Sequence, residues 1–225
     1  MRTITFKGLF LTAVFMLLGS LAIQAADYGL ITKQITIKLD EAGTLSGKIG
    51  YNKKSQITNL KIVGEINGSD LDFVREMTGV NFFGRPVEGN LSVLDLSEAK
   101  IIKGGSFYYV SEDFYYDEHY YTTDDVIGSY TFYKCRNLKS LKLPSGVTEI
   151  GSSAFEDCSN LTSLTIPSGV TEIGSSAFKD CTDLTSLSLP SGITEIGSSA
   201  FEDCRGLTSL TIPSGVTEIG SSAFK

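Results

Sequence analysis

A 23-residue repeat dominates the second half of the chain. Three full copies begin at Leu138, Leu161 and Leu184, and a fourth copy begins at Leu207 and runs to Lys225. The second copy reads LTSLTIPSGVTEIGSSAFKDCTD. One such unit is too short to bury its own apolar face, so neighbouring units must stack to form a continuous core. The repeat therefore predicts an elongated stack.

Within one unit, apolar residues mark three sides. Leu161, Leu164 and Ile166 alternate with polar residues, which indicates a short strand with one buried face. A Pro-Ser-Gly turn follows, and a second extended segment then carries Val170 and Ile173 inward. Gly174 bends the chain again, and the remaining side holds Ala177, Phe178 and Cys181. The period and the L-x-x-L-x-[LI] pattern predict an α/β-type repeat solenoid, a right-handed leucine-rich repeat stack with many strands and short helical turns.

The sequence of the repeats resembles that of the BspA-like leucine-rich repeat family of bacterial surface proteins. The resemblance rests on IGSSAF-x-D-C-x-x-L-x-x-L-x-[IL]-P blocks that begin at Ile150, Ile173 and Ile196. It covers residues 127–225 and extends more weakly upstream. It implies a secreted or surface-displayed protein that mediates adhesion, and it identifies no ligand.

The upstream part carries degenerate copies. The segment IGSYTFYKC, from Ile127 to Cys135, aligns with IGSSAFEDC, and LSVLDLS from Leu91 is another strand pattern. We expect leucine-rich repeats over 91–225, with an insertion at about 103–125. We expect an N-terminal cap over 26–90, with a degenerate first repeat near 57–66.

The cap has two further predicted elements. One is a strand that places Ile31, Ile35, Ile37 and Leu39 on one face. The other is a short helix that Ser69 caps with Asp72 as its partner and that ends at Gly79. At the opposite end of the array, the last predicted strand carries Leu207, Leu210 and Ile212 and leaves one flank uncovered.

Residues 1–25 have the plan of a secretory signal peptide. Arg2 and Lys7 precede an apolar run from Leu9 to Leu18, and small residues follow up to Ala25. Ten apolar residues are too few to cross a bilayer, which takes about 20, so we expect no membrane insertion. We expect export to the cell surface or the extracellular space, with the periplasm as the alternative.

The charge of the chain argues against two kinds of partner. Without Arg2 and Lys7, the 19 basic residues fall to 17 against 26 acidic ones, a formal charge of −9. A negative protein without a Lys/Arg cluster is not expected to bind nucleic acid or anionic membranes.

Three periodic rows of side chains are candidate sites. Four cysteines recur every 23 residues in an apolar slot between Phe and Leu, which favours buried free thiols over the disulfides that an exported protein would otherwise suggest. No C-x-x-C pair is present, so we expect no zinc site and no other metal or cofactor. Outward hydroxyl groups are interpreted as filler with good strand propensity, with binding by avidity as the alternative. A row of glutamates is interpreted as a solvated edge, with attraction of cations as the alternative. The rows contain Cys135, Cys158, Cys181 and Cys204; Ser140, Ser163, Ser186 and Ser209, beside Lys142, Thr165, Ser188 and Thr211; and Glu149, Glu172, Glu195 and Glu218.

The insertion contains the segment FYYVSEDFYYDEHYY at 107–121. We interpret it as a loop that leaves the repeat and lies outside the core, because Gly104-Gly105 opens it and a Thr-Thr-Asp-Asp run closes it. Tyrosine provides large contact area at a small entropic cost, so the insertion is a candidate binding surface. The alternative, weighted nearly equally, is that the rings fold back over neighbouring repeats and shield them. The candidate ligand contacts are Tyr108, Tyr109, Tyr115, Tyr116, Tyr120 and Tyr121.

These features predict a binding protein in preference to an enzyme. His119 has no matched cysteine, serine or second histidine with which to form a catalytic pair. We expect the solenoid to bind a protein or glycan ligand at the bacterial surface, such as a host matrix protein. The alternative is a non-binding spacer that displays another module. We also expect end-to-end self-association through residues 207–225.

Overall fold

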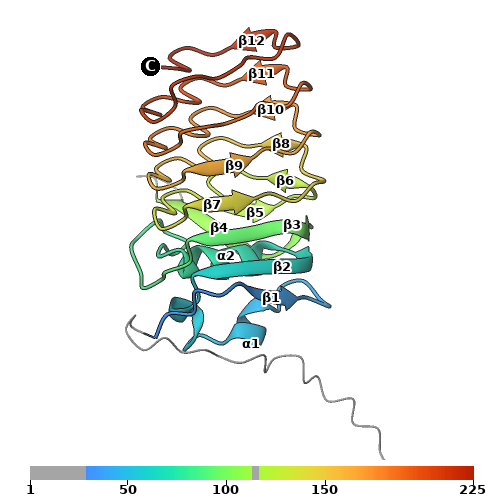
Figure 1. Cartoon of the computed structure of the whole chain (residues 1–225). Helices are drawn as coiled ribbons and strands as arrows, with labels where there is room; N and C mark the ends of the chain where they lie inside the picture. Colours follow the sequence, from blue (N-terminus) through green and yellow to red (C-terminus); the bar gives the residue numbers. More distant parts are fainter. Residues whose placement is uncertain (1–28, 113–116) are drawn as a thin grey trace, which may run out of the picture.

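The computed structural model describes residues 29–112 and 117–225, and it confirms the leucine-rich repeat solenoid. Figure 1 shows the strands stacked along one axis, from β1 near the N-terminal end to β12 at the C-terminal end. Among the described residues, every paired strand outside one hairpin is parallel to its neighbours. The predicted signal peptide, 1–25, lies outside the described residues.

The first sheet runs along one side of the stack. Its strands pair one repeat apart, so that Leu141 lies beside Leu164 and the leucines form a continuous buried row. Beyond the last strand, pairing is reduced to a single bridge between Ser163 and Ser186. The strand that the sequence predicts around Leu210 is not formed, and the equivalent segment around Leu187 forms only that bridge. The strands, in spatial order, are β1 (Ile35–Lys38), β2 (Asn59–Ile66), β3 (Val93–Ile101), β7 (Ser140–Lys142) and β9 (Ser163–Thr165).

A second parallel sheet is built from two-residue strands. In four of the five strands an exposed glutamate precedes the isoleucine, and in β6 Val126 takes its place; the isoleucine is buried in all but the terminal repeat. A glycine follows each isoleucine because the next turn passes very close. At Gly174, a Cβ atom would lie 2.5 Å from the backbone nitrogen of Ser152, so only glycine fits. The strands are β6 (Val126–Ile127), β8 (Glu149–Ile150), β10 (Glu172–Ile173), β11 (Glu195–Ile196) and β12 (Glu218–Ile219).

The third side of each unit consists of hydrogen-bonded turns. The sequence predicts short helical turns here, but Ser176 and Asp180 have φ angles of 56° and 59°, which no right-handed helix can contain. Backbone N–H groups instead donate to the next unit, as from Phe155 to the carbonyl oxygen of Ala177 at 2.8 Å. This ladder holds the phenylalanine rings in a stack, with centroids 5.1–5.4 Å apart and planes within 8° of parallel. The rings are those of Phe132, Phe155, Phe178, Phe201 and Phe224.

The N-terminal part contributes α1 (Leu45–Ile49), the 3₁₀ helix η1 (Lys54–Gln56) and α2 (Gly68–Met77). Helix α2 begins one residue before the predicted cap. Its N-cap is Asn67, whose side chain accepts from the N–H of Ser69, and Asp70 accepts from the N–H of Asn67. The prediction that Ser69 is the cap with Asp72 as its partner is therefore wrong. Asp70 also accepts from the N–H groups of Gly43 and Leu45, which fixes α2 against the start of α1. No helix in the described ranges is both long enough and apolar enough to cross a membrane.

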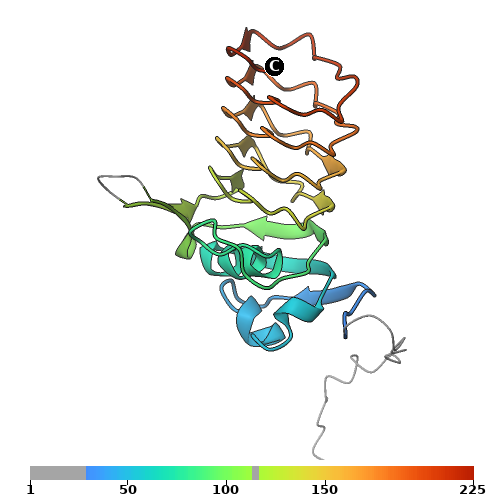
Figure 2. The ribbon, with the colours of Figure 1, turned by 90° about the vertical axis from the view of Figure 1, so that its left-hand side faces the viewer.

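The insertion is a β-hairpin. Strand β4 (Gly104–Glu112) pairs antiparallel with β5 (Asp117–Thr122), and Figure 2 shows the hairpin projecting from the side of the stack opposite the first sheet. The base of β4 packs against α2. Tyr108 and Tyr109 belong to the hydrophobic core, and Val110 is buried as well. The prediction of a loop outside the core is therefore wrong for this part, because these three consecutive residues of β4 are buried at the junction between cap and repeats.

Candidate functional site

The hairpin has an inner face that anchors it to the stack. The Tyr109 ring stacks on Tyr130 with centroids 4.8 Å apart, and Tyr120 meets Tyr130 edge-on at 5.0 Å. Arg75 of α2 is fully buried and places its guanidinium carbon 5.2 Å from the centre of the Tyr109 ring. The same guanidinium group donates to the carbonyl oxygens of Tyr130 and Thr131 at 2.9 and 3.0 Å. This face shields the junction, as the alternative interpretation of the insertion expects.

The phenols packed beneath the hairpin stay protonated, and two of them donate hydrogen bonds. Burial raises the pKa of Tyr109 to about 12. Burial also raises the pKa of Tyr120, and its O–H donates to the Glu118 carboxylate at 2.7 Å, which raises the pKa further. The Tyr108 hydroxyl group donates to the carbonyl oxygen of Ser129 at 2.9 Å. These rings are therefore held in place and remain neutral at physiological pH.

The outer face of the hairpin carries a second group of rings, which we call the aromatic face. The Phe107 ring lies at its centre: it meets the His119 ring at 4.7 Å and the Phe82 ring at 5.4 Å, both edge-on. Tyr121 extends the cluster at 6.3 Å from Phe107 and is 55% exposed. The His119 side chain is also exposed, whereas the three phenylalanines are half-buried. The aromatic face consists of Phe82, Phe83, Phe107, His119 and Tyr121.

The structure divides the predicted tyrosine contacts into three groups. Tyr108 and Tyr109 are 1% and 7% exposed, so their rings belong to the core and not to a free surface. Tyr120 is half-buried on the inner face, and Tyr121 lies on the aromatic face. Tyr115 and Tyr116 lie outside the described residues. Ligand contact by any of these residues remains a prediction.

Sequence reasoning missed Phe82 and Phe83. They are about 25 residues from Phe107 in the chain, and they reach it because the carbonyl oxygen of Phe82 accepts from the N–H of Val110 at 2.8 Å. The signal for the turn that presents them is Asn81, whose side chain accepts from the N–H groups of Phe83 and Arg85. The Arg85 guanidinium carbon in turn lies 5.2 Å from the centre of the Phe83 ring.

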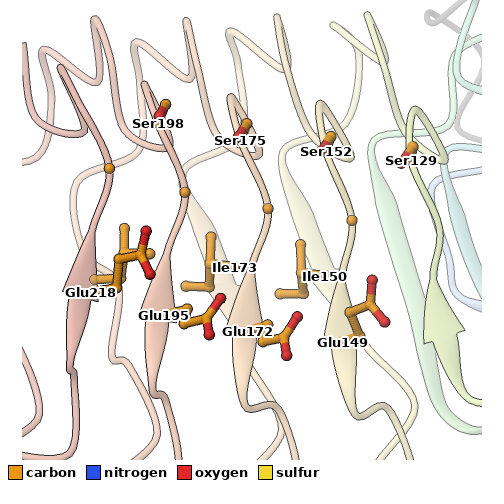
Figure 3. Close-up of a pocket in the computed structure, with 15 residues that line it drawn as sticks. Ser129, Glu149, Ile150, Ser152, Glu172, Ile173, Ser175, Glu195, Ser198 and Glu218 are labelled. Atoms are coloured by element: carbon orange, nitrogen blue, oxygen red, sulfur yellow. The ribbon is translucent and has the colours of Figure 1, made fainter.

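The glutamate row forms one wall of a shallow groove along the second sheet. Figure 3 shows the row Glu149, Glu172, Glu195 and Glu218 running beside a parallel row of serines, Ser129, Ser152, Ser175 and Ser198. Glycine backbone forms the floor between the rows. Within 29–112 and 117–225, no cluster of three His, Cys, Asp or Glu side chains could hold a metal ion. We therefore keep the interpretation of the glutamate row as a solvated surface.

The cysteine slots are filled by free thiols. All four cysteines are buried and unbridged, as the slot between Phe and Leu predicts. The Cys158 thiol donates to the carbonyl oxygen of Phe132 at 3.0 Å, and Cys181 and Cys204 repeat this bond one and two units later. Burial raises the pKa of each thiol, that of Cys204 to about 12. The thiols therefore stay protonated and act as small core residues that cap a carbonyl group.

Comparison with known proteins identifies the family of the repeats. Residues 97–225 match the model of the BspA-type leucine-rich repeat region in six copies. No curated protein matches the chain in sequence. Among crystal structures, a leucine-rich repeat protein of T. pallidum is 36% identical, covering 44% of this chain and 47% of that chain, with a TM-score of 0.44. A leucine-rich repeat protein from Bacteroides ovatus is 38% identical, covering 51% and 29%, with a TM-score of 0.41.

A leucine-rich cell surface protein from Faecalibacterium prausnitzii is 26% identical, covering 52% of this chain and 43% of that chain, with a TM-score of 0.34. This chain thus spans less than half the length of each of these three proteins. The family model covers more than half of the chain. The chain belongs to the BspA-type leucine-rich repeat family.

Proposed function

We propose that the protein is exported, is displayed at the bacterial surface and binds a protein or glycan ligand through the aromatic face. The observation that carries this proposal is the position of that face. It lies on a hairpin that projects from the stack (Figure 2). It combines exposed Tyr121 and His119 with half-buried phenylalanines. The outward positions of the repeats carry mainly Ser, Thr and Glu.

The rings are suited to binding because they are already held in place. Phe107 fixes His119 and Tyr121 from below, and the inner face of the hairpin is anchored on Arg75 and Tyr130. A preorganised aromatic surface loses little conformational entropy when a ligand binds. Tyrosines in such positions often contribute more than 1 kcal/mol each to an interface. The apolar run and small residues of 1–25 support export.

Binding to a panel of immobilised matrix proteins and polysaccharides tests the proposal. We expect the wild-type chain to bind at least one member and Tyr121→Ala to weaken that binding about tenfold. Tyr51→Ala is the matched control, because Tyr51 is 67% exposed and lies outside the aromatic face. Equal loss in both variants, or no binding to any member, would contradict the proposal. Failure across the whole panel would favour the spacer.

A further inference from the structure

We propose that the free edge of β5 binds an extended, positively charged peptide segment of a protein ligand by adding it as a third strand. This inference rests on the proposed function for its location. The partner that the hairpin takes is a basic peptide strand and not a glycan.

The direction of one hydrogen bond shows which backbone groups are free. The N–H of Val110 donates to the carbonyl oxygen of Phe82, so it points away from β5. Val110 is paired with His119 across the hairpin. In an antiparallel ladder, a residue whose N–H points outward belongs to a non-hydrogen-bonded pair, and its partner points outward as well. The N–H and C=O groups of His119 therefore face away from β4.

The same alternation extends along β5. Strand groups repeat their direction every second residue, so those of Asp117 and Tyr121 face the same way as those of His119. β4 and β5 form a two-stranded sheet, and among the described residues these three positions make no backbone hydrogen bond outside the hairpin. The opposite edge, on β4, is already covered at Phe82. A row of unpaired groups on an edge strand is a template for an incoming strand.

The negative charge of β5 favours a positively charged strand at its free edge. Asp117 and Glu118 are exposed on β5, and the stretch 104–125 contains no lysine or arginine. A second copy that paired through its own β5 would bring carboxylates against carboxylates, which is destabilising in cross-strand pairs. A strand with alternating Lys or Arg would place a cation by Asp117 and its aliphatic stems over Tyr121 and Phe107, on the face of the hairpin opposite Glu118 and Tyr120.

The probe for this surface is the peptide Lys-Val-Lys-Val-Lys-Val with blocked ends. Two control peptides match it: one carries N-methyl groups on every second residue, which removes strand pairing without changing charge, and one has Glu in place of Lys. We expect the wild-type full chain to bind the unmodified peptide at least tenfold more tightly than either control. We also expect Asp117→Asn to weaken binding, and Asp183→Asn, an exposed site in the repeats, to leave it unchanged.

Two substitutions at His119 distinguish the contribution of its backbone N–H from that of its side chain. His119→Pro removes an N–H that faces outward while sparing the hydrogen bonds inside the hairpin, and His119→Ala keeps that N–H. We expect the proline variant to bind the peptide at least tenfold more weakly than the alanine variant. Equal binding of plain and N-methylated peptides to wild type overturns strand addition, as does no binding of the plain peptide. If Tyr121→Ala still reduces ligand capture in that case, the proposed function stands and only the edge is wrong.

Discussion

The guanidinium group of Arg75 lies against the face of the Tyr109 ring, and both side chains are enclosed by protein. Arg75 belongs to α2 and Tyr109 to β4, so this contact joins the N-terminal part to the inserted hairpin. The carbonyl groups of Tyr130 and Thr131 complete the arrangement by accepting hydrogen bonds from the same guanidinium. One arginine thus connects the cap, the hairpin and the degenerate copy at 127–135.

Arg75→Lys is expected to lower the free energy of unfolding by about 2–3 kcal/mol, because a lysine cannot reproduce the planar fork and leaves a buried carbonyl group without its donor. Chemical denaturation followed by circular dichroism measures the change. Arg205→Lys is the control, since the Arg205 side chain is 77% exposed and its pairing with Asp203 contributes little. An equal effect in the two variants would show that Arg75 does not connect the three parts.

Asp72 is expected to make stability depend on pH. Burial, and then the nearby Glu76 carboxylate, raise the pKa of Asp72 from 3.8 to about 6, and its Oδ1 atom is buried without a hydrogen-bond partner. Because the folded state holds the proton more tightly than the unfolded state, this contribution to stability is complete below pH 3.8 and is lost as the pH rises through about 6. Arg75 and Lys54 oppose the shift.

Asp72→Asn should therefore be more stable than wild type at pH 7, by about 1 kcal/mol after allowance for partial exposure, and should show no advantage near pH 4. Thermal unfolding at a series of pH values measures this difference. Asp183→Asn, at an exposed position, should follow the wild-type curve throughout. A gain at Asp72 that is the same at every pH would contradict a role for its ionisation.

The thiols are expected to be reduced and protected. Folded protein at pH 8 should react slowly with a thiol reagent, because all four cysteines are buried and their pKa values are raised. After denaturation without a reductant, all four should react. Four missing thiols would instead indicate disulfide bridges and would overturn the ladder of free cysteines.

Self-association through residues 207–225 remains a prediction, and the exposed side chains suggest how to test it. Ile219 and Phe224 are 49% and 48% exposed, and Leu210 is only partly buried. We expect the sedimentation coefficient of the mature chain, residues 26–225, to rise with concentration, and Leu210→Lys to reduce that rise. A wild-type chain that sediments as a monomer at every concentration would rule out this contact.

The repeats could be predicted from the sequence because the same pattern of apolar residues recurs in each copy. Phe178, Cys181 and Ile173 recur at one spacing, so their burial follows from the need of each unit to cover the next. The hairpin has no second copy with which to compare it. Its aromatic residues point to both faces, and only packing against Arg75 distinguishes buried Tyr109 from exposed Tyr121.

The start of α2 could not be settled from the sequence for a related reason. Asn67 with Asp70 and Ser69 with Asp72 are both plausible capping pairs within six residues. The choice depends on a tertiary contact, because only Asp70 also receives N–H groups from Gly43 and Leu45. The contribution of Phe82 to the aromatic face was missed for the same kind of reason, since Phe82 reaches Phe107 through backbone pairing to β4.

In the register of the stack, Leu141 lies beside Leu164 one repeat later, so the number of repeats sets the length of the array. Gaining or losing one 23-residue unit shifts the far end by about 4.8 Å, the spacing of neighbouring strands, and leaves every other unit with the same neighbours. The hairpin is attached between β3 and β7, ahead of these units, where Arg75 holds it. The length of the array and the chemistry of the projecting surface can therefore change independently, by duplication of units in one case and by point substitution in the other.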